Sequence, residues 1–154
     1  METRLLKPMF DLGQLGLMPF SPRNRESIYE AVKKSDIVIN LIGKHYETKH
    51  FVKTRKADGS INRINYNFDE VHNAIPSLIA EVSKEAGVKR FIHVSALSAN
   101  INSASDFNSS KARGEISVRE KFPEAIIVRP ANIFGEEDKF LQWIASYCHN
   151  MYTL

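Results

Sequence analysis

The feature that most constrains the fold of this chain is an alternation of short apolar runs with longer segments of helical periodicity. Residues 36–43 (DIVINLIG), 90–95 (RFIHVS) and 125–129 (AIIVR) are rich in β-branched side chains, and residues 16–20 form a shorter apolar run. Such runs are typical of parallel strands covered on both faces. Helical patterns follow each run, which predicts successive right-handed βαβ units. We therefore expect an α/β, Rossmann-like parallel sheet with helices on both faces.

The expected helices carry signals at their ends. Asn24 is placed as the N-cap of a short amphipathic helix, and Gly87 is placed as the C′ residue of a longer helix that precedes it. Pro76 interrupts the longer helix and should kink it or mark an early break, because proline has no backbone N–H to donate. Residues 107–122 and 138–147 are the remaining helical segments.

Composition and charge exclude several classes of protein. At 154 residues the chain suits one domain with a sizeable core, and its single cysteine, Cys148, excludes an internal disulfide framework. Residues 52–65 carry four cations and one anion: Lys53, Arg55, Lys56, Arg63 and Asp58. Removing these from the 21 basic and 18 acidic residues leaves 17 of each, so the rest of the chain carries no net charge. The excess charge therefore indicates a solvated, basic polar insertion, and we expect no nucleic-acid partner.

Neither a membrane span nor a metal site is expected. No apolar run approaches the roughly 20 residues that a spanning helix needs, and residues 1–10 show no signal peptide, so membrane association would come through a partner. The five histidines lack metal-ligand spacing and should be structural or exposed: His45, His50, His72, His93 and His149.

The carboxyl ends of the predicted strands are where a ligand would bind in such a sheet. Gly43 ends one strand, and its missing side chain would let a ring or phosphate approach the backbone, although it could equally serve only to turn the chain. A G-x-G-x-x-G dinucleotide fingerprint is not found, because Gly13 and Gly16 form only G-x-x-G ahead of an apolar run. We therefore expect a sheet that lacks the first strands of its fold and exposes an edge or an apolar face.

Four segments together resemble one family: residues 11–15 (DLGQL), 35–43 (SDIVINLIG), 84–101 (KEAGVKRFIHVSALSANI) and 122–141 (FPEAIIVRPANIFGEEDKFL). They are similar to the Rossmann-fold accessory subunits of mitochondrial NADH:ubiquinone oxidoreductase, respiratory complex I. These subunits belong to the atypical, extended short-chain dehydrogenase/reductase group.

The resemblance implies how the chain is organised. It implies a partial NAD(P)-binding domain over residues 1–145, interrupted by the insertion at residues 52–65, and a divergent tail over residues 146–154. It also implies that the chain is a fragment or truncated isoform of the longer family members.

Cofactor-binding positions follow from the same resemblance. The family's residues beside the cofactor correspond here to Asn40, Leu41, Ile42, Gly43, Ser95, Lys111, Arg129 and Pro130. The first four form the loop after the family's fourth strand, and Ser95 ends its fifth strand. Lys111 matches the lysine of Tyr-x-x-x-Lys, which binds the nicotinamide ribose. Arg129 and Pro130 match the Arg-Pro pair near the nicotinamide.

Phe107 stands where the resemblance calls for the tyrosine, four residues before Lys111 and on the same helical face. A reductase needs an ionisable hydroxyl there, whose pKa the neighbouring ammonium lowers, and phenylalanine has no proton to give. Without the resemblance, Phe107 would be a core residue and Lys111 a solvated one. Tyr46, in a ligand-side loop, is a weaker candidate for a substitute donor. No catalytic residue is therefore predicted.

The resemblance implies a non-catalytic accessory subunit of complex I that supports assembly or stability on the matrix side of the mitochondrial inner membrane. Other complex I subunits would be its partners, and NADPH, the cofactor of the full-length family, would bind residually at most. One alternative is an active NAD(P)-dependent short-chain reductase or nucleotide-sugar epimerase-like enzyme. Another is a free-standing dinucleotide sensor.

Overall fold

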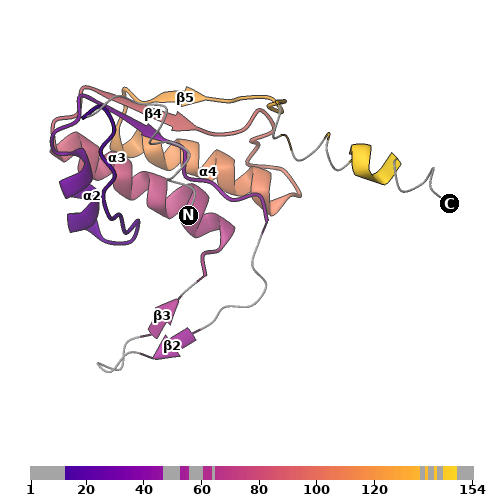
Figure 1. The fold of residues 1–154 in the computed structure, drawn as a ribbon, viewed down its shortest axis with the longest axis horizontal. Coiled ribbons are helices and arrows are strands. Elements are labelled where there is room, and N and C mark those ends of the chain that lie inside the picture. Colours follow the sequence, from indigo (N-terminus) through magenta and orange to yellow (C-terminus); the bar gives the residue numbers. More distant parts are fainter. Residues whose placement is uncertain are drawn as a thin grey trace.

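A three-stranded parallel sheet forms the centre of the fold (Figure 1). The computed structural model describes residues 13–46, 53–55, 61–63, 65–135, 138, 141 and 144–148. The strands are β1 (Ile37–Asn40), β4 (Arg90–Val94) and β5 (Ile126–Val128), with β4 in the middle. Their register sets Ile37 opposite Arg90 and Ile92 opposite Ile126. The predicted parallel α/β fold is confirmed.

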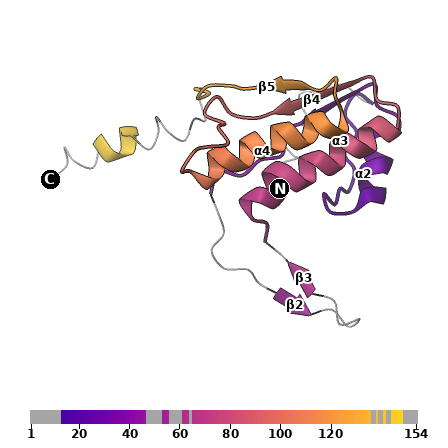
Figure 2. The same ribbon diagram turned by 180° about the vertical axis from the view of Figure 1, so that it is seen from behind.

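The helices between residues 25 and 121 lie together on one face of this sheet, as Figures 1 and 2 show from opposite sides. They are α2 (Arg25–Val32), the π-helical turn η2 (Glu70–Ala74), α3 (Ile75–Glu85) and α4 (Asp106–Lys121). The core between helices and sheet includes the fully buried Ile28, Val82, Phe91 and Val118. Within the described part of the chain, no helix has the length and hydrophobicity needed to cross a membrane.

The opposite face of the sheet differs from the expectation of helices on both faces, since none of the elements α2 to α4 covers it. Ile37 and Ile39 of β1 are 49% and 57% exposed, and Ile126 and Val128 of β5 are 49% and 41% exposed. The cause lies in the topology. The connections from β1 to β4 and from β4 to β5 step across the sheet in the same direction, so right-handed crossovers place α3 and α4 on one side.

The signals at the helix ends are confirmed, but the first expected strand is wrong. The Asn24 side chain caps α2 by accepting hydrogen bonds from the backbone N–H groups of Glu26 and Ser27, and Gly87 adopts a φ of +75° after α3. Residues 16–20 form no strand. No described strand lies beside them to accept and donate backbone hydrogen bonds, and an apolar run alone cannot form a strand without such pairing.

The basic insertion contributes a short antiparallel ribbon. β2 (Lys53–Arg55) pairs with β3 (Ile61–Arg63), with Lys53 opposite Arg63, and the ribbon projects from the sheet and its helices (Figure 1). The sequence pattern predicted a polar loop here and gave no strand signal. The expectations about residues 1–10, His50 and His149 fall outside the described residues.

The helical segment after the insertion changes its winding just before Pro76, where the sequence predicted a kink or break. In η2 the Ile75 N–H bonds to the Glu70 carbonyl, and Pro76 lies in the first turn of α3. Pro76 cannot donate the α-helical bond to the His72 carbonyl four residues earlier. That carbonyl faces Gly114 of α4, where a Cβ atom would lie 1.8 Å from its oxygen. The missing side chain at Gly114 thus permits α4 to pack directly on η2.

A substitution at Gly114 tests this contact. We expect Gly114→Ala to lower the free energy of unfolding by about 2–3 kcal/mol, because α4 or η2 must move apart to admit the methyl group. Gly16→Ala is the matched control, since its Cβ meets nothing within 4 Å, and it should change stability by less than about 0.5 kcal/mol. Urea denaturation of both variants measures the difference. Equal stability of the two would contradict the packing described here.

Candidate functional site

A cavity of about 960 Å³ lies at the carboxyl ends of β4 and β5. Its lining brings together Ser95 after β4, Phe107 on α4 and Pro130 after β5. The other lining residues are His45, Ala96, Leu97, Ser98, Ala131, Asn132 and Ile133. A cavity of this size can accept a small-molecule ligand. Three positions that the sequence placed at one site therefore share one cavity.

Lys111 is buried beneath the strand ends, with 7% of its surface exposed. Its ammonium donates to the Val94 carbonyl at 3.4 Å. A Cβ atom on Gly43 would lie 3.4 Å from the Lys111 Nζ, so the bare glycine borders the ammonium. Burial lowers the pKa of Lys111, and the nearby Glu115 carboxylate offsets part of that effect. The structure thus brings Lys111 and Gly43 together, as a shared site requires.

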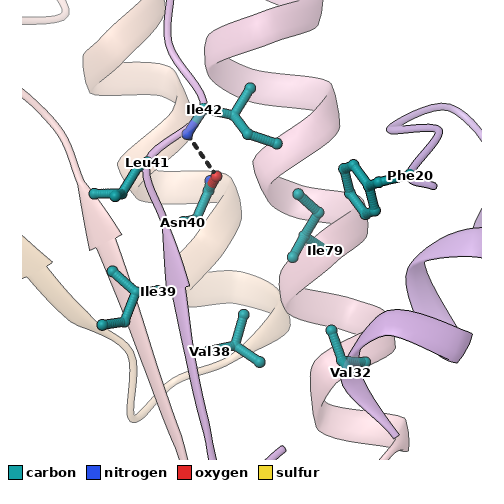
Figure 3. A pocket seen from close by; sticks show the side chains of 8 residues that line it. All are labelled: Phe20, Val32, Val38, Ile39, Asn40, Leu41, Ile42 and Ile79. Atoms are coloured by element: carbon teal, nitrogen blue, oxygen red, sulfur yellow. Dashed lines mark hydrogen bonds between the residues drawn. The ribbon is translucent and has the colours of Figure 1, made fainter. Parts of the chain in front are cut away.

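Asn40 shapes the loop that follows β1. Its Oδ1 accepts the Ile42 N–H at 3.0 Å, a contact drawn in Figure 3, and its Nδ2 lies 3.1 Å from Nδ1 of His93. The amide nitrogen is the donor in that pair, so His93 carries its proton on Nε2. This buried nitrogen has no hydrogen-bond partner among the described residues. Leu41 points away from α3 and is 73% exposed.

Arg129 is occupied by an ion pair with α4. Its Nε donates to Glu115 Oε1 at 2.9 Å, and a second bond from Nη2 makes the contact bidentate. Burial would raise the pKa of Glu115, but the Arg129 hydrogen bonds and charge outweigh it and lower that pKa. Arg129 does not line the cavity that Pro130 lines. The sequence singled out Arg129 by resemblance and missed Glu115, whose only signal is its spacing of four residues from Lys111.

The Phe107 ring packs edge to face against two other rings. Its centroid lies 5.9 Å from that of Phe68 and 5.2 Å from that of His72. The Lys111 ammonium is 6.0 Å from the same centroid, at the outer limit of a cation–π contact. The position where a reductase has a tyrosine phenol is thus filled by a phenyl ring packed against two other rings.

His72 links three segments of the chain. Its Nε2 accepts the backbone N–H of Lys44 at 3.2 Å, and its Nδ1 lies 2.9 Å from Oγ of Ser110. The Ser110 hydroxyl donates to the Phe107 carbonyl at 2.9 Å, so it accepts from His72. The bonds at both ring nitrogens therefore place the proton of the neutral His72 ring on Nδ1. Ser110 therefore helps to hold His72 and Phe107 in place.

Burial, together with the charge of Lys111, lowers the pKa of His72 to about 4. The same two causes lower the pKa of His93 to about 4. Both rings are therefore neutral at pH 7. Among the described residues no three His, Cys, Asp or Glu side chains are grouped to hold a metal ion. The expectation that these histidines are structural agrees with their burial and bonding.

Tyr46, the weaker candidate for a proton donor, is 62% exposed. Its ring lies edge to face with His45 and 5.2 Å from the Lys44 ammonium. It does not line the cavity that contains Phe107.

Comparison with curated proteins identifies relatives along nearly the whole chain. It is 48% identical over 142 residues to NADH dehydrogenase [ubiquinone] 1 alpha subcomplex subunit 9, mitochondrial, of Mus musculus. It is 44% identical over 145 residues to the NADH-ubiquinone oxidoreductase 40 kDa subunit, mitochondrial, of Neurospora crassa. These alignments cover 92% and 94% of the chain. The chain is a homologue of these mitochondrial subunits.

The homology spans part of the relatives only. The matched stretches are 34% of the mouse subunit and 35% of the Neurospora subunit, so the chain spans about one third of their length. No family model matches the chain. The resemblance noted in the four sequence segments is confirmed as a similarity to part of these subunits.

Solved structures support the fold class. A dTDP-4-dehydrorhamnose reductase from Clostridium acetobutylicum superposes with a TM-score of 0.61 at 15% identity, over 96% of this chain and 55% of that one. The Bacillus anthracis reductase of the same name, solved with NADP, gives a TM-score of 0.60 at 15% identity. At such low identity the likeness establishes a Rossmann-like fold and nothing about chemistry.

The buried histidines give stability a pH dependence with a definite sign. The unfolded chain binds a proton at each histidine near pH 6.5, whereas the folded chain resists it down to about pH 4. Stability is therefore fully present above about pH 6.5 and falls as the pH drops toward 4, by up to roughly 3 kcal/mol per histidine.

Urea midpoints at pH 5 and pH 7.5 check this expectation. His72→Gln keeps a donor and an acceptor without titrating, so its stability should change less between the two pH values than that of the unaltered chain. His45→Gln, at an exposed residue, is the control and should keep the full change. If His72→Gln kept the full pH dependence, His72 would not contribute to it.

Proposed function

We propose that the chain acts as a non-catalytic accessory subunit of mitochondrial respiratory complex I and supports assembly or stability of the complex on the matrix side of the inner membrane. Its partners would be other subunits of the complex. Homology over 92% of the chain to a subunit of mitochondrial NADH dehydrogenase supports this role. Because the chain spans about one third of that relative, the role of the whole subunit is carried over as a proposal.

The observation that carries the non-catalytic part is the environment of Phe107. Short-chain reductases place an ionisable phenol four residues before the conserved lysine, and here that position holds a ring packed on Phe68 and His72. Hydride transfer to a carbonyl requires a proton at the oxygen that forms, and a phenyl ring cannot provide one. Lys111 is retained without the group whose pKa it would lower.

Two described side chains near Phe107 are poorly suited to replace the phenol. His72 is neutral at pH 7 because its pKa is about 4, and both of its ring nitrogens are already hydrogen-bonded. Tyr46 is exposed and turned toward Lys44. These features favour the accessory role over a reductase or epimerase-like enzyme.

The residues fit one half of a dinucleotide better than the other. Ser95 and Pro130 line the cavity at the strand ends, and Lys111 donates to the Val94 carbonyl at the end of β4. These groups suit a nicotinamide ribose. The diphosphate half requires a glycine-rich turn that leads into a helix N-terminus, and the described residues contain no such turn. We therefore propose that the cofactor, whose chemistry is hydride exchange, is held residually at most and takes part in no reaction here.

Blue native electrophoresis of mitochondria tests the accessory role. A tagged copy of the chain, expressed in the source organism, should migrate with the assembled complex and with its NADH dehydrogenase activity. The Gly114→Ala variant, whose fold is disturbed where α4 packs on η2, is the comparison and should be depleted from that band. If the unaltered chain is abundant in mitochondria yet absent from the band, the proposal is wrong.

A further inference from the structure

Two buried polar atoms at the carboxyl end of β4 have no direct hydrogen-bond partner among the described residues. They are Nε2 of His93 and Oγ of Ser95, and these two residues are 1% and 5% exposed. Because Nδ1 of His93 accepts from the Asn40 amide, Nε2 carries the proton and is a donor. A buried N–H or hydroxyl without a partner is costly, so native proteins normally provide one.

The two atoms lie on the same side of the sheet. Phe91, two residues before His93, belongs to the core beneath the helices. His93 and Ser95 therefore face the helices as well, since residues two apart lie on one face of a strand. Asn40 holds Nδ1 on the β1 side of the His93 ring, so Nε2 is turned away from β1. Both unpartnered atoms thus face the layer between the sheet and α4.

Two buried charged residues of α4 lie opposite these atoms, Lys111 at 7% and Glu115 at 8% exposure. Besides burial, the charge of Lys111 lowers the pKa of His93, and the charge of Glu115 raises it. Burial raises the pKa of Glu115, whereas its bonds to Arg129 and the Ser95 hydroxyl lower it. These mutual effects place His93, Ser95 and Glu115 around one small space between β4 and α4.

The groups around this space decide what can bind in it. His93 offers a donor, whereas the Glu115 carboxylate offers lone pairs that its bonds to Arg129 leave free. A ligand must therefore accept a hydrogen bond from the ring and donate one to the carboxylate. A halide ion can only accept and is repelled by Glu115, and a metal ion cannot accept from an N–H. Water does both, and buried waters typically make about three hydrogen bonds to groups of this kind.

Ser95 connects the space to a larger cavity. It is one of the residues that line the cavity of about 960 Å³ at the strand ends. A water molecule can therefore reach the Ser95 hydroxyl from that cavity without any opening of the apolar core around Phe91.

We propose that one ordered water molecule binds between β4 and α4, where it accepts from His93 Nε2–H, donates to the Glu115 carboxylate and has the Ser95 hydroxyl as its third partner. The water joins the Asn40–His93 pair to the Glu115–Arg129 ion pair, so that one network crosses the sheet from β1 to the end of β5. This site belongs to the interior of the chain and is independent of the accessory role.

Relaxation dispersion of water oxygen-17, measured on the full 154-residue chain, tests the proposal because it counts water molecules held inside a protein. His93→Leu removes the donor and Ser95→Ala removes the third partner, so each should lower the count by about one. His93→Gln offers an amide N–H in place of the ring N–H and should keep the water. Cooperative urea transitions show that each variant is folded.

A matched control and a second measurement locate and identify the bound species. His72 is as buried as His93, but both of its ring nitrogens have direct partners, so His72→Gln should leave the count unchanged. In crystals of the chain grown with sodium bromide, we expect a density peak within about 3.2 Å of both His93 Nε2 and Ser95 Oγ. That peak should show no anomalous signal at the bromine absorption edge.

Four results would overturn the proposal. An unchanged count in both His93→Leu and Ser95→Ala would place the internal waters elsewhere. An equal loss in His72→Gln would show that the count does not report on this site. A bromide signal at the peak would identify an anion as the ligand. A direct bond between His93 Nε2 and Glu115 in the crystal, with no peak between them, would show that the protein itself satisfies the N–H.

Discussion

The site at the carboxyl ends of the strands depends on the close packing of η2 against α4, and His72 lies at the centre of that contact. Its carbonyl meets Gly114, while its ring bonds to Lys44 after β1 and to Ser110 on α4. These three contacts fix the loop that contains Gly43 and the helix that contains Lys111 relative to one another. The same residue that shapes the site is thus neutral, buried and fully hydrogen-bonded, which suits a structural support and not a proton donor.

A parallel sheet needs cover on two faces, and the described residues supply one. The helices α2, α3 and α4 build a core on one side with Phe91 and Val118 at zero exposure. The other side has the aliphatic composition of a buried face without a described helix over it. This asymmetry follows from the strand order β1-β4-β5, in which every connection steps the same way.

Local patterns in the sequence predicted much of the fold. Runs of β-branched residues located β1, β4 and β5, and Asn24 and Gly87 marked helix ends whose geometry depends on a few neighbouring residues. The run at residues 16–20 was misassigned because a strand requires a partner that periodicity cannot reveal. A kink or break at Pro76 was expected, but the π-helical winding of η2 and the contact with Gly114 were not, since Pro76 and Gly114 belong to different helices.

The candidate site was predictable by resemblance at single positions and not as a network. Ser95, Phe107 and Pro130 share a cavity as expected, whereas Arg129 turns to Glu115. His72 and its partners Lys44 and Ser110 lie 28 and 38 positions apart in sequence, and no spacing rule connects them. The identity of Phe107 predicted that a phenol is missing at this position, but only the structure shows that its ring packs on Phe68 and His72.

We propose that this site is held together by its own side chains and holds a cofactor residually at most. Differential scanning fluorimetry of the purified chain with 1 mM NADPH tests it most directly, because a ligand that binds the native state raises the melting temperature. We expect the melting temperature to rise by less than about 1 °C, corresponding to a few tenths of a kcal/mol for a chain of this size. A rise of several degrees that Lys111→Met removes would contradict it.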